Sequence, residues 1–326
     1  MEGRGRRDLN PDVVAAITRL RADNVLAGPQ ATLLNRVARR HLVSVRLEIR
    51  ILLYVGVLLL TSGVGVLVVE HQQEIGPLAI AGALGLAAAA CLVWVARQAP
   101  PFSWRAVESP NVAFDYILLL GLLLLASDLG YVEAQFTVLG PRWAHHLLIV
   151  GVVYLLAAYR WDSRAVLGLA LTTLAAWRGV SVSLMSLRRG AADLGDLRTN
   201  AIVIGVLYVV LATLSVRLER KAHFEEVFGN TGLLLLFGAL VSGVLGAFAW
   251  GAWLATLLAV AGLVMWISFG LGRSLYFAEG VVAAYLGLLR FLFQGRASSA
   301  SFLVAALLGI GALALIVAAH RRMVER

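Results

Sequence analysis

The chain has 326 residues, of which 60% are apolar and only 14% are charged, and its mean hydropathy is +0.84. This balance excludes a soluble domain of the same length and is typical of a protein with several transmembrane helices. The formal charge of +9 is spread over the ends of apolar segments, so it does not indicate a nucleic-acid partner.

The basic residues are almost all arginine, since Lys221 is the only lysine in the chain. This bias is typical of a GC-rich bacterial genome. A single cysteine, Cys91, excludes an intrachain disulfide and any site built from several cysteines. About fifty polar-rich residues precede the first apolar segment, so a cleavable signal peptide is not indicated.

Residues 1–50 predict a short cytoplasmic helical region with a basic character. Asn10 and Pro11 are suited to a helix N-terminus, and Gly28-Pro29 separates this first helix from a second one. Arginines surround the second helix and lead into the first span: Arg36, Arg39, Arg40, Arg46 and Arg50. We expect them to lie over anionic lipid headgroups. Docking of a partner protein is the alternative for this region.

Residues 51–326 predict a transmembrane helical domain, because about twenty apolar residues are needed to cross the hydrocarbon layer. About ten segments meet or approach this length: Ile51–Val69, Ile75–Ala96, Val112–Val132, Trp143–Tyr159, Ala165–Leu187, Ala201–Val216, Thr231–Ala249, Trp253–Gly270, Ser274–Phe293 and Ser301–Ala319. The fold class is therefore all-α, a polytopic helical bundle. The fourth and sixth segments are short, which leaves the count open by one or two.

The orientation follows from the distribution of basic residues. With the N-terminus inside, 21 of them fall on the inner side and six on the outer side, while Arg290 lies within a span. The excess of arginine on cytoplasmic loops predicts that both termini are cytoplasmic and that the protein lies in the bacterial inner membrane.

Two spans carry small residues at four-residue spacing, which lets helix backbones approach closely. They are Ala81, Gly85 and Ala89 in the second span and Gly238, Ser242 and Gly246 in the seventh. We expect both faces to be packed against neighbouring helices.

Several stretches resemble a known family. They are RLEIRILLYVGVLLLTSGVGVLVVEH (Arg46–His71), LGYVEAQFTVLG (Leu129–Gly140) and YRWDSRAVLGLALTTLAAW (Tyr159–Trp177). In order and character they resemble the predicted bacterial membrane proteins of domain-of-unknown-function family 2157, over roughly residues 10–180. Many members have Ala-Asn-Trp after the first span, where this chain has Val69-Glu70-His71. The resemblance implies a polytopic membrane architecture and no particular activity.

Five charged residues lie inside predicted spans, where a charge costs at least about 2.5 kcal/mol. Arg178 is interpreted as a residue near a span end that extends to the interface, which leaves four candidate functional residues. In the predicted topology Asp115 and Glu279 lie near the cytoplasmic face, and Asp128 and Arg290 lie near the outer face. Glu279 and Arg290 share one helical face, about 16 Å apart, whereas Asp115 and Asp128 are about 140° apart around their helix. One hypothesis is a polar route, with Asp115 and Glu279 handling protons or cations and Asp128 pairing with Arg290. The alternatives are buried structural pairs and side chains that extend to the interfaces.

No metal site, cofactor or catalytic centre is predicted. His71, His145 and His146 fall on the outer side with several glutamates, but adjacent histidines on a helix point about 100° apart, so a solvated polar rim is the preferred interpretation. The sequence contains no phosphate-binding loop, dinucleotide fingerprint, nucleophile elbow or HExxH motif, so it does not indicate an enzyme. Two functions stay open: transport of a small solute or ion through the bundle, and a non-catalytic scaffold, sensor or complex subunit, including a homo-oligomer, that docks a partner through residues 1–50.

Overall fold

The computed structural model describes residues 19–23, 27, 28, 30, 34, 46–188, 194–246, 249–293 and 299–324. The chain divides into two compact units, Met1–Gly63 and Val64–Arg326. Most of the predicted basic region lies outside the described residues, including Arg36, Arg39 and Arg40. Arg46 and Arg50 lie at the beginning of the first long helix.

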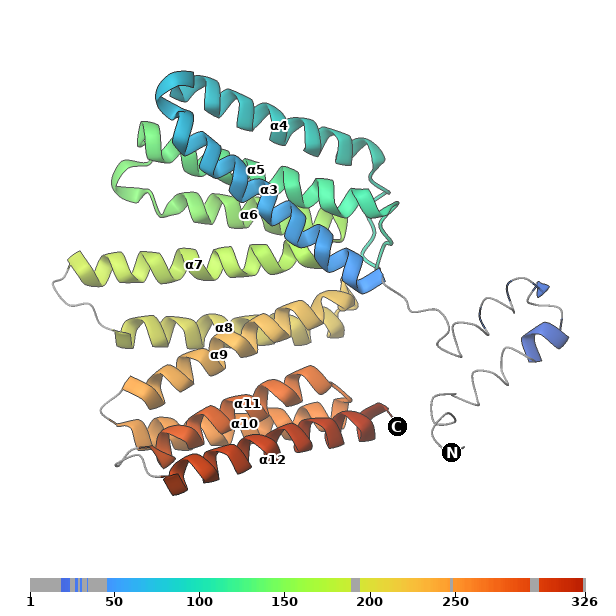
Figure 1. Ribbon diagram of the computed structural model, residues 1–326, viewed down its shortest axis with the longest axis vertical. Helices are drawn as coiled ribbons and strands as arrows, with labels where there is room; N and C mark the ends of the chain where they lie inside the picture. Colours follow the sequence, from blue (N-terminus) through green and yellow to red (C-terminus); the bar gives the residue numbers. More distant parts are fainter. Residues whose placement is uncertain are drawn as a thin grey trace. The chain divides into compact units, whose positions relative to one another are not determined.

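From Arg46 onward the described residues form ten α-helices and two short 3-10 helices, and contain no strand (Figure 1). Each predicted apolar segment corresponds to one of these α-helices. Their bounds are α3 (Arg46–Ile75), α4 (Pro77–Gln98), α5 (Val112–Phe136), α6 (His145–Trp161), α7 (Arg164–Arg188), α8 (Leu194–Arg217), α9 (Glu225–Gly246), α10 (Trp250–Leu271), α11 (Ser274–Leu292) and α12 (Ser299–Val324), with η1 (Gly140–Arg142) and η2 (Ala222–Phe224) between them.

Seven helices among the described residues are long and apolar enough to cross a membrane, namely α4, α5 and α8 to α12. Helix α6 is apolar but has only 17 residues. The all-helical fold with several apolar helices is that of a multi-pass membrane protein. The predicted total of about ten spans stays a prediction.

Local sequence explains several helix ends. Helix α4 begins with Pro77 directly after Gly76, whose φ of 82° suits glycine. Helix α5 is capped by the Asn111 side chain, which accepts a hydrogen bond from the Phe114 backbone N–H at 2.8 Å. Helix α10 ends at Gly272, in the left-handed conformation common at helix C-termini.

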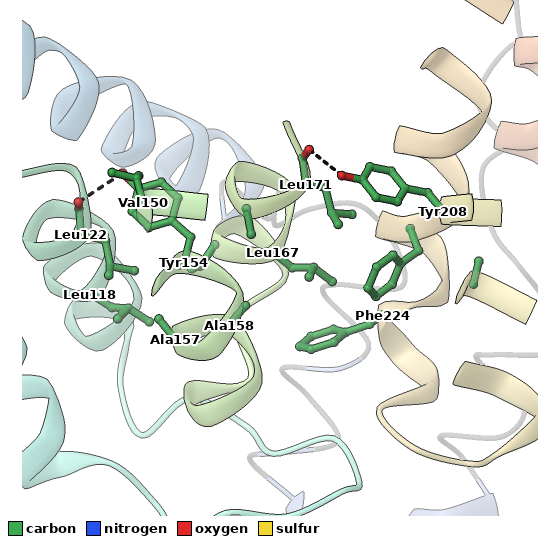
Figure 2. Close-up of a cluster of buried hydrophobic side chains, with 14 of the residues drawn as sticks. Leu118, Leu122, Val150, Tyr154, Ala157, Ala158, Leu167, Leu171, Tyr208 and Phe224 are labelled. Carbon is green, nitrogen blue, oxygen red and sulfur yellow. Dashed lines mark hydrogen bonds between the residues drawn. The ribbon is translucent and has the colours of Figure 1, made fainter. Parts of the chain in front are cut away.

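Within residues 64–326, the most extensive packing is between successive antiparallel helices, α4 with α5, α6 with α7, α8 with α9 and α10 with α11 (Figure 1). The largest buried cluster is built from residues of α4 to α9 and η2 (Figure 2). Two tyrosines in this cluster each donate a hydrogen bond from the hydroxyl to a backbone carbonyl of the preceding helix. Tyr154 donates to the Leu122 carbonyl at 3.1 Å, and Tyr208 donates to the Leu171 carbonyl at 3.0 Å. Each bond gives a buried polar group the partner that an apolar environment requires.

Helices α8 and α9 approach each other closely at two glycines. A Cβ at Gly205 would lie 2.7 Å from the Gly232 carbonyl oxygen, and a Cβ at Gly232 would lie 2.7 Å from the Gly205 oxygen. The face predicted on α9 is not the one at this crossing, because Gly238, Ser242 and Gly246 are exposed and a Cβ at Gly238 would meet open space. On this face Arg198 of α8 donates a hydrogen bond to the Ser242 hydroxyl at 3.1 Å. Spacing shows where a neighbour could approach, whereas the fold determines which face receives it.

Candidate functional site: a charge cluster at one end of the bundle

Four connections meet at one end of the bundle (Figure 1). They are residues 99–111 before α5, residues 162–163 before α7, residues 218–224 before α9 and residues 272–273 before α11. In the predicted topology this is the cytoplasmic end. Charged side chains from three of these connections and from the adjoining helix ends contact one another here.

Lys221 lies at the centre of this end. Its side chain is 1% exposed, and its ammonium is 2.9 Å from Oδ1 of Asp162, whose side chain is 4% exposed. Both residues have left-handed backbones, with φ of 51° and 58°. Such backbones are unfavourable for most non-glycine residues, so the surrounding contacts must hold them in place.

The segment before α5 covers this ion pair. The Val107 backbone N–H donates to Oδ2 of Asp162 at 2.5 Å, and the Lys221 backbone N–H donates to the Trp104 carbonyl at 2.8 Å. The ammonium also lies 5.4 Å from the centre of the Phe102 ring and 5.8 Å from that of Phe224. Aromatic faces stabilise a cation at this distance, most strongly where water is excluded.

His223 adds a third titratable group to the cluster. Its Nε2 lies 2.6 Å from Oδ1 of Asp162, the same oxygen that Lys221 contacts, and its side chain is 15% exposed. Asp162 is thus held by a backbone N–H, an ammonium and an imidazole from two other connections. This arrangement satisfies a buried carboxylate, and truncating one partner would leave the others uncompensated.

A second group of charges continues toward α11. Arg273 is 2.6 Å from a carboxylate oxygen of Glu225 and 3.3 Å from one of Glu226, and Arg164 is 3.1 Å from Glu226. The Tyr276 hydroxyl donates to Oε1 of Glu225 at 2.8 Å. These contacts form a continuous series from the half-exposed Glu226 to a tyrosine on α11.

The arrangement holds several charges together through ion pairs and hydrogen bonds. Among the described residues no group of three or more His, Cys, Asp and Glu side chains could hold a metal ion. The pocket next to Lys221 and Asp162 has a volume of about 10 Å³, room for about one water molecule and far below the roughly 300–1,000 Å³ of most small-molecule sites. One of its lining residues, Trp161, has a buried indole N–H with no partner among the described residues.

The structure places the predicted intramembrane residues on two separate helices. Asp115 accepts a hydrogen bond from the Ser109 hydroxyl at 2.7 Å, at the beginning of α5. Asp128 lies further along α5, and a Cβ at Gly85 of α4 would be 3.2 Å from its Oδ2. One carboxylate oxygen of Asp128 has no partner among the described residues.

Glu279 and Arg290 are both on α11 and both half-buried. Oε2 of Glu279 and Nε of Arg290 are buried without a hydrogen-bond partner in the described part of the chain. Helix α11 packs against α9, α10 and α12, whereas α5 packs against α4 and α6. Asp128 and Arg290 therefore do not form the predicted ion pair, and Asp115 and Glu279 are not brought together.

Sequence reasoning missed the central ion pair. Lys221 was counted only among the basic residues of the inner side, and Asp162 was included only as part of the YRWDSR stretch. One signal was available, because a single lysine in a chain that otherwise uses arginine marks a position where a compact ammonium is required.

Comparisons of the chain with protein-family models, with curated proteins and with solved structures found no match. The fold and the site thus define a class, a multi-pass helical membrane protein whose charged groups gather at one end. The resemblance to family 2157 stays a prediction.

Proposed function

We propose that this membrane protein moves protons or a small cation through the part of its bundle formed by α9, α10 and α11. The observation that carries the proposal is Glu279, which has a buried carboxylate oxygen without a partner in the described part of the chain. An ionisable residue inside a membrane span is costly, and such residues commonly mark ion or proton pathways.

Polar contacts lead from one end of the bundle to the turn before Glu279. Arg273 and Glu226 have side chains that are 40% and 46% exposed, whereas the side chain of Glu225 is only 12% exposed. Glu225 accepts the hydrogen bond of Tyr276, which is a donor one helical turn from Glu279 on the same side of α11. Exposure thus falls from Arg273 and Glu226 to Glu225, and the two members of the series on α11, Tyr276 and Glu279, are partly buried.

The packing of α9 allows Tyr276 to occupy this position. A Cβ at Gly229 of α9 would overlap the Tyr276 hydroxyl, so glycine is needed where the tyrosine crosses. Further along the same face of α11, Arg290 is the next charged residue. Its positive charge would repel protons and other cations alike, so Arg290 does not distinguish between these two candidate species.

The proposal includes the orientation derived from the arginine distribution. The end that carries Lys221 and Glu225 faces the cytoplasm of a bacterial inner membrane, and both termini are cytoplasmic. Membership of family 2157 belongs to the same proposal and rests on the three stretches quoted above.

The test uses the full chain reconstituted in vesicles that contain a pH-sensitive dye. We expect a pH gradient to dissipate faster with the wild-type protein than in empty vesicles. Glu279→Gln should abolish this difference, and Tyr276→Phe should reduce it by roughly tenfold, a low value for removing a positioned proton-transfer group. The matched control is Asp128→Asn, which neutralises an intramembrane acid on α5, outside the proposed route, and should retain the flux.

Wild-type vesicles without proton or cation flux would overturn this proposal if the protein is folded. The second candidate function, a non-catalytic scaffold or complex subunit, would then be preferred. A specific observation favours it, since the buried contacts of Asp162 and Lys221 hold three connections in a fixed arrangement suited to docking. Copurification of a stoichiometric partner that is lost with residues 1–50 would support it.

A further inference from the structure

One face of α12 is left uncovered by the rest of the chain within residues 64–326. The opposite face packs against α11, where Ala319 lies in a buried cluster with Phe277 and Val281. On the uncovered face Ile310 is 63% exposed and Leu313 is 65% exposed. This face forms an open groove that is apolar for most of its length and ends at Arg321 and Arg322.

The spacing of the groove residues makes the groove continuous. Ile310, Leu313, Val317 and Arg321 follow at intervals of three or four residues, so they form one stripe along the helix. From Ile310 to Arg321 the stripe is about 16 Å long at 1.5 Å per residue. One leaflet of a bilayer has about half of the 30 Å hydrocarbon thickness. The distance from Ile310 to the arginine end of the stripe therefore matches the depth of one leaflet, and the arginines lie where its headgroups begin.

We infer that this groove binds one anionic phospholipid of the cytoplasmic leaflet. An acyl chain lies along Leu313 and Val317, and the phosphate is held by the guanidinium groups of Arg321 and Arg322. Charge complementarity determines the class of lipid, because guanidinium donors bind phosphate and attract anionic headgroups. The proposal rests on α12 spanning the membrane in the orientation given under the proposed function, and it does not depend on transport through α11.

The test is native mass spectrometry of the full chain, titrated with phosphatidylglycerol or with phosphatidylcholine of the same acyl chains. We expect one phosphatidylglycerol molecule to be retained in preference to phosphatidylcholine. Replacing both arginines (Arg321→Gln with Arg322→Gln) should weaken its retention by roughly 30-fold, as expected for two headgroup contacts. Ala314→Trp keeps both arginines but fills the groove, and should also weaken retention of the lipid.

A matched control removes two other arginines from the same end of the bundle. Arg97 and Arg217 are exposed residues in the last turns of α4 and α8. Arg97→Gln with Arg217→Gln should leave the retained lipid in place. An equal loss in both double variants would overturn the proposal in favour of general surface charge. A dimer that Ala314→Trp dissociates, with lipid retention unchanged, would also overturn it and would assign the face to a second copy.

Discussion

Lys221 and Asp162 form a buried ion pair at 2.9 Å, and each residue has a left-handed backbone on a different connection. Left-handed conformations cost roughly 1 to 2 kcal/mol for most residues. Two of them beside one ion pair indicate that the pair is held by its surroundings. The aromatic rings of Phe102 and Phe224 and the backbone N–H of Val107 provide those surroundings. The pair therefore joins three connections that are distant in the sequence.

Removing one member of this pair should destabilise the protein strongly. Lys221→Met leaves the Asp162 carboxylate buried without its main partner, and we expect a loss of roughly 3 to 5 kcal/mol. Adding Asp162→Asn to Lys221→Met should restore part of that loss, because no uncompensated charge remains. Thermal unfolding of the full chain in detergent measures both effects.

The control for this prediction is a more exposed ion pair at the same end. Arg164 and Glu226 have side chains that are 55% and 46% exposed, so Arg164→Gln should cost less than about 1 kcal/mol. If Lys221→Met and Arg164→Gln unfold at the same temperature, the buried Lys221–Asp162 pair contributes no more to stability than the exposed Arg164–Glu226 pair, and the prediction is wrong.

Replacing glycines of α9 by alanine should lower stability where α9 crosses α8 closely, but not on the open face of α9. Gly232→Ala places a Cβ 2.7 Å from the backbone oxygen of Gly205, which cannot rotate away, and we expect a loss of roughly 1 to 3 kcal/mol. Gly238→Ala is the matched control on the same helix. Its Cβ meets open space, and alanine favours a helix, so its stability should be unchanged or higher by up to about 1 kcal/mol. Equal unfolding temperatures for the two variants would contradict the assigned crossing.

Much of the fold follows from hydropathy alone, because each apolar segment of helical length became one helix. The helix ends did not follow. Helix α3 continues through Glu70 to Ile75, and α9 begins at Glu225 rather than near Thr231. The hydrogen bonds of a helix continue beyond the last apolar residue, and Glu225 is held by a contact from α11. Hydropathy averaged along the sequence shows neither effect.

The candidate site was less predictable than the fold. Hydropathy identifies Asp128 and Glu279, since an isolated charge stands out in an apolar segment. It cannot identify Lys221 and Asp162, because each lies in a polar connection where a charge is ordinary. Their contact depends on which helix ends meet, and that is decided by tertiary packing. The close approach of Gly205 to Gly232 is of the same kind.

The orientation can be tested with reporter fusions. The connections that contain Arg105 and Arg220 lie at one end of the bundle, since Trp104 and Lys221 are hydrogen-bonded there. Fusions after Arg105, after Arg220 and at the C-terminus should therefore all report the cytoplasm, as the arginine distribution predicts. A fusion after Thr137, at the other end of α5, should report the periplasm. Opposite results for Arg105 and Arg220 would contradict the arrangement itself, and a uniform reversal would contradict only the orientation.

Asp128 and Arg290 should act independently in a double-mutant cycle. The sequence allows them to pair, since both lie near the outer end of their spans. In the structure, however, Asp128 lies against Gly85 of α4, and Arg290 belongs to α11, which packs against α9, α10 and α12. Effects of distant residues usually add within about 0.5 kcal/mol. We expect the changes in unfolding free energy for Asp128→Asn and Arg290→Gln to add within this range.

The cycle needs a positive control to show that coupling can be detected in this protein. Arg273 and Glu225 are 2.6 Å apart, with the carboxylate largely buried, so Arg273→Gln and Glu225→Gln should deviate from additivity by roughly 0.5 to 3 kcal/mol. Coupling of that size between Asp128 and Arg290 would mean that α5 and α11 meet in the membrane, which would restore the outer ion pair that the sequence predicts. If the effects of Asp128→Asn and Arg290→Gln add, while those of Arg273→Gln and Glu225→Gln do not, Arg290 has no partner on α5. It then lies only on the face of α11 that carries Glu279, where it can influence only the route through α11.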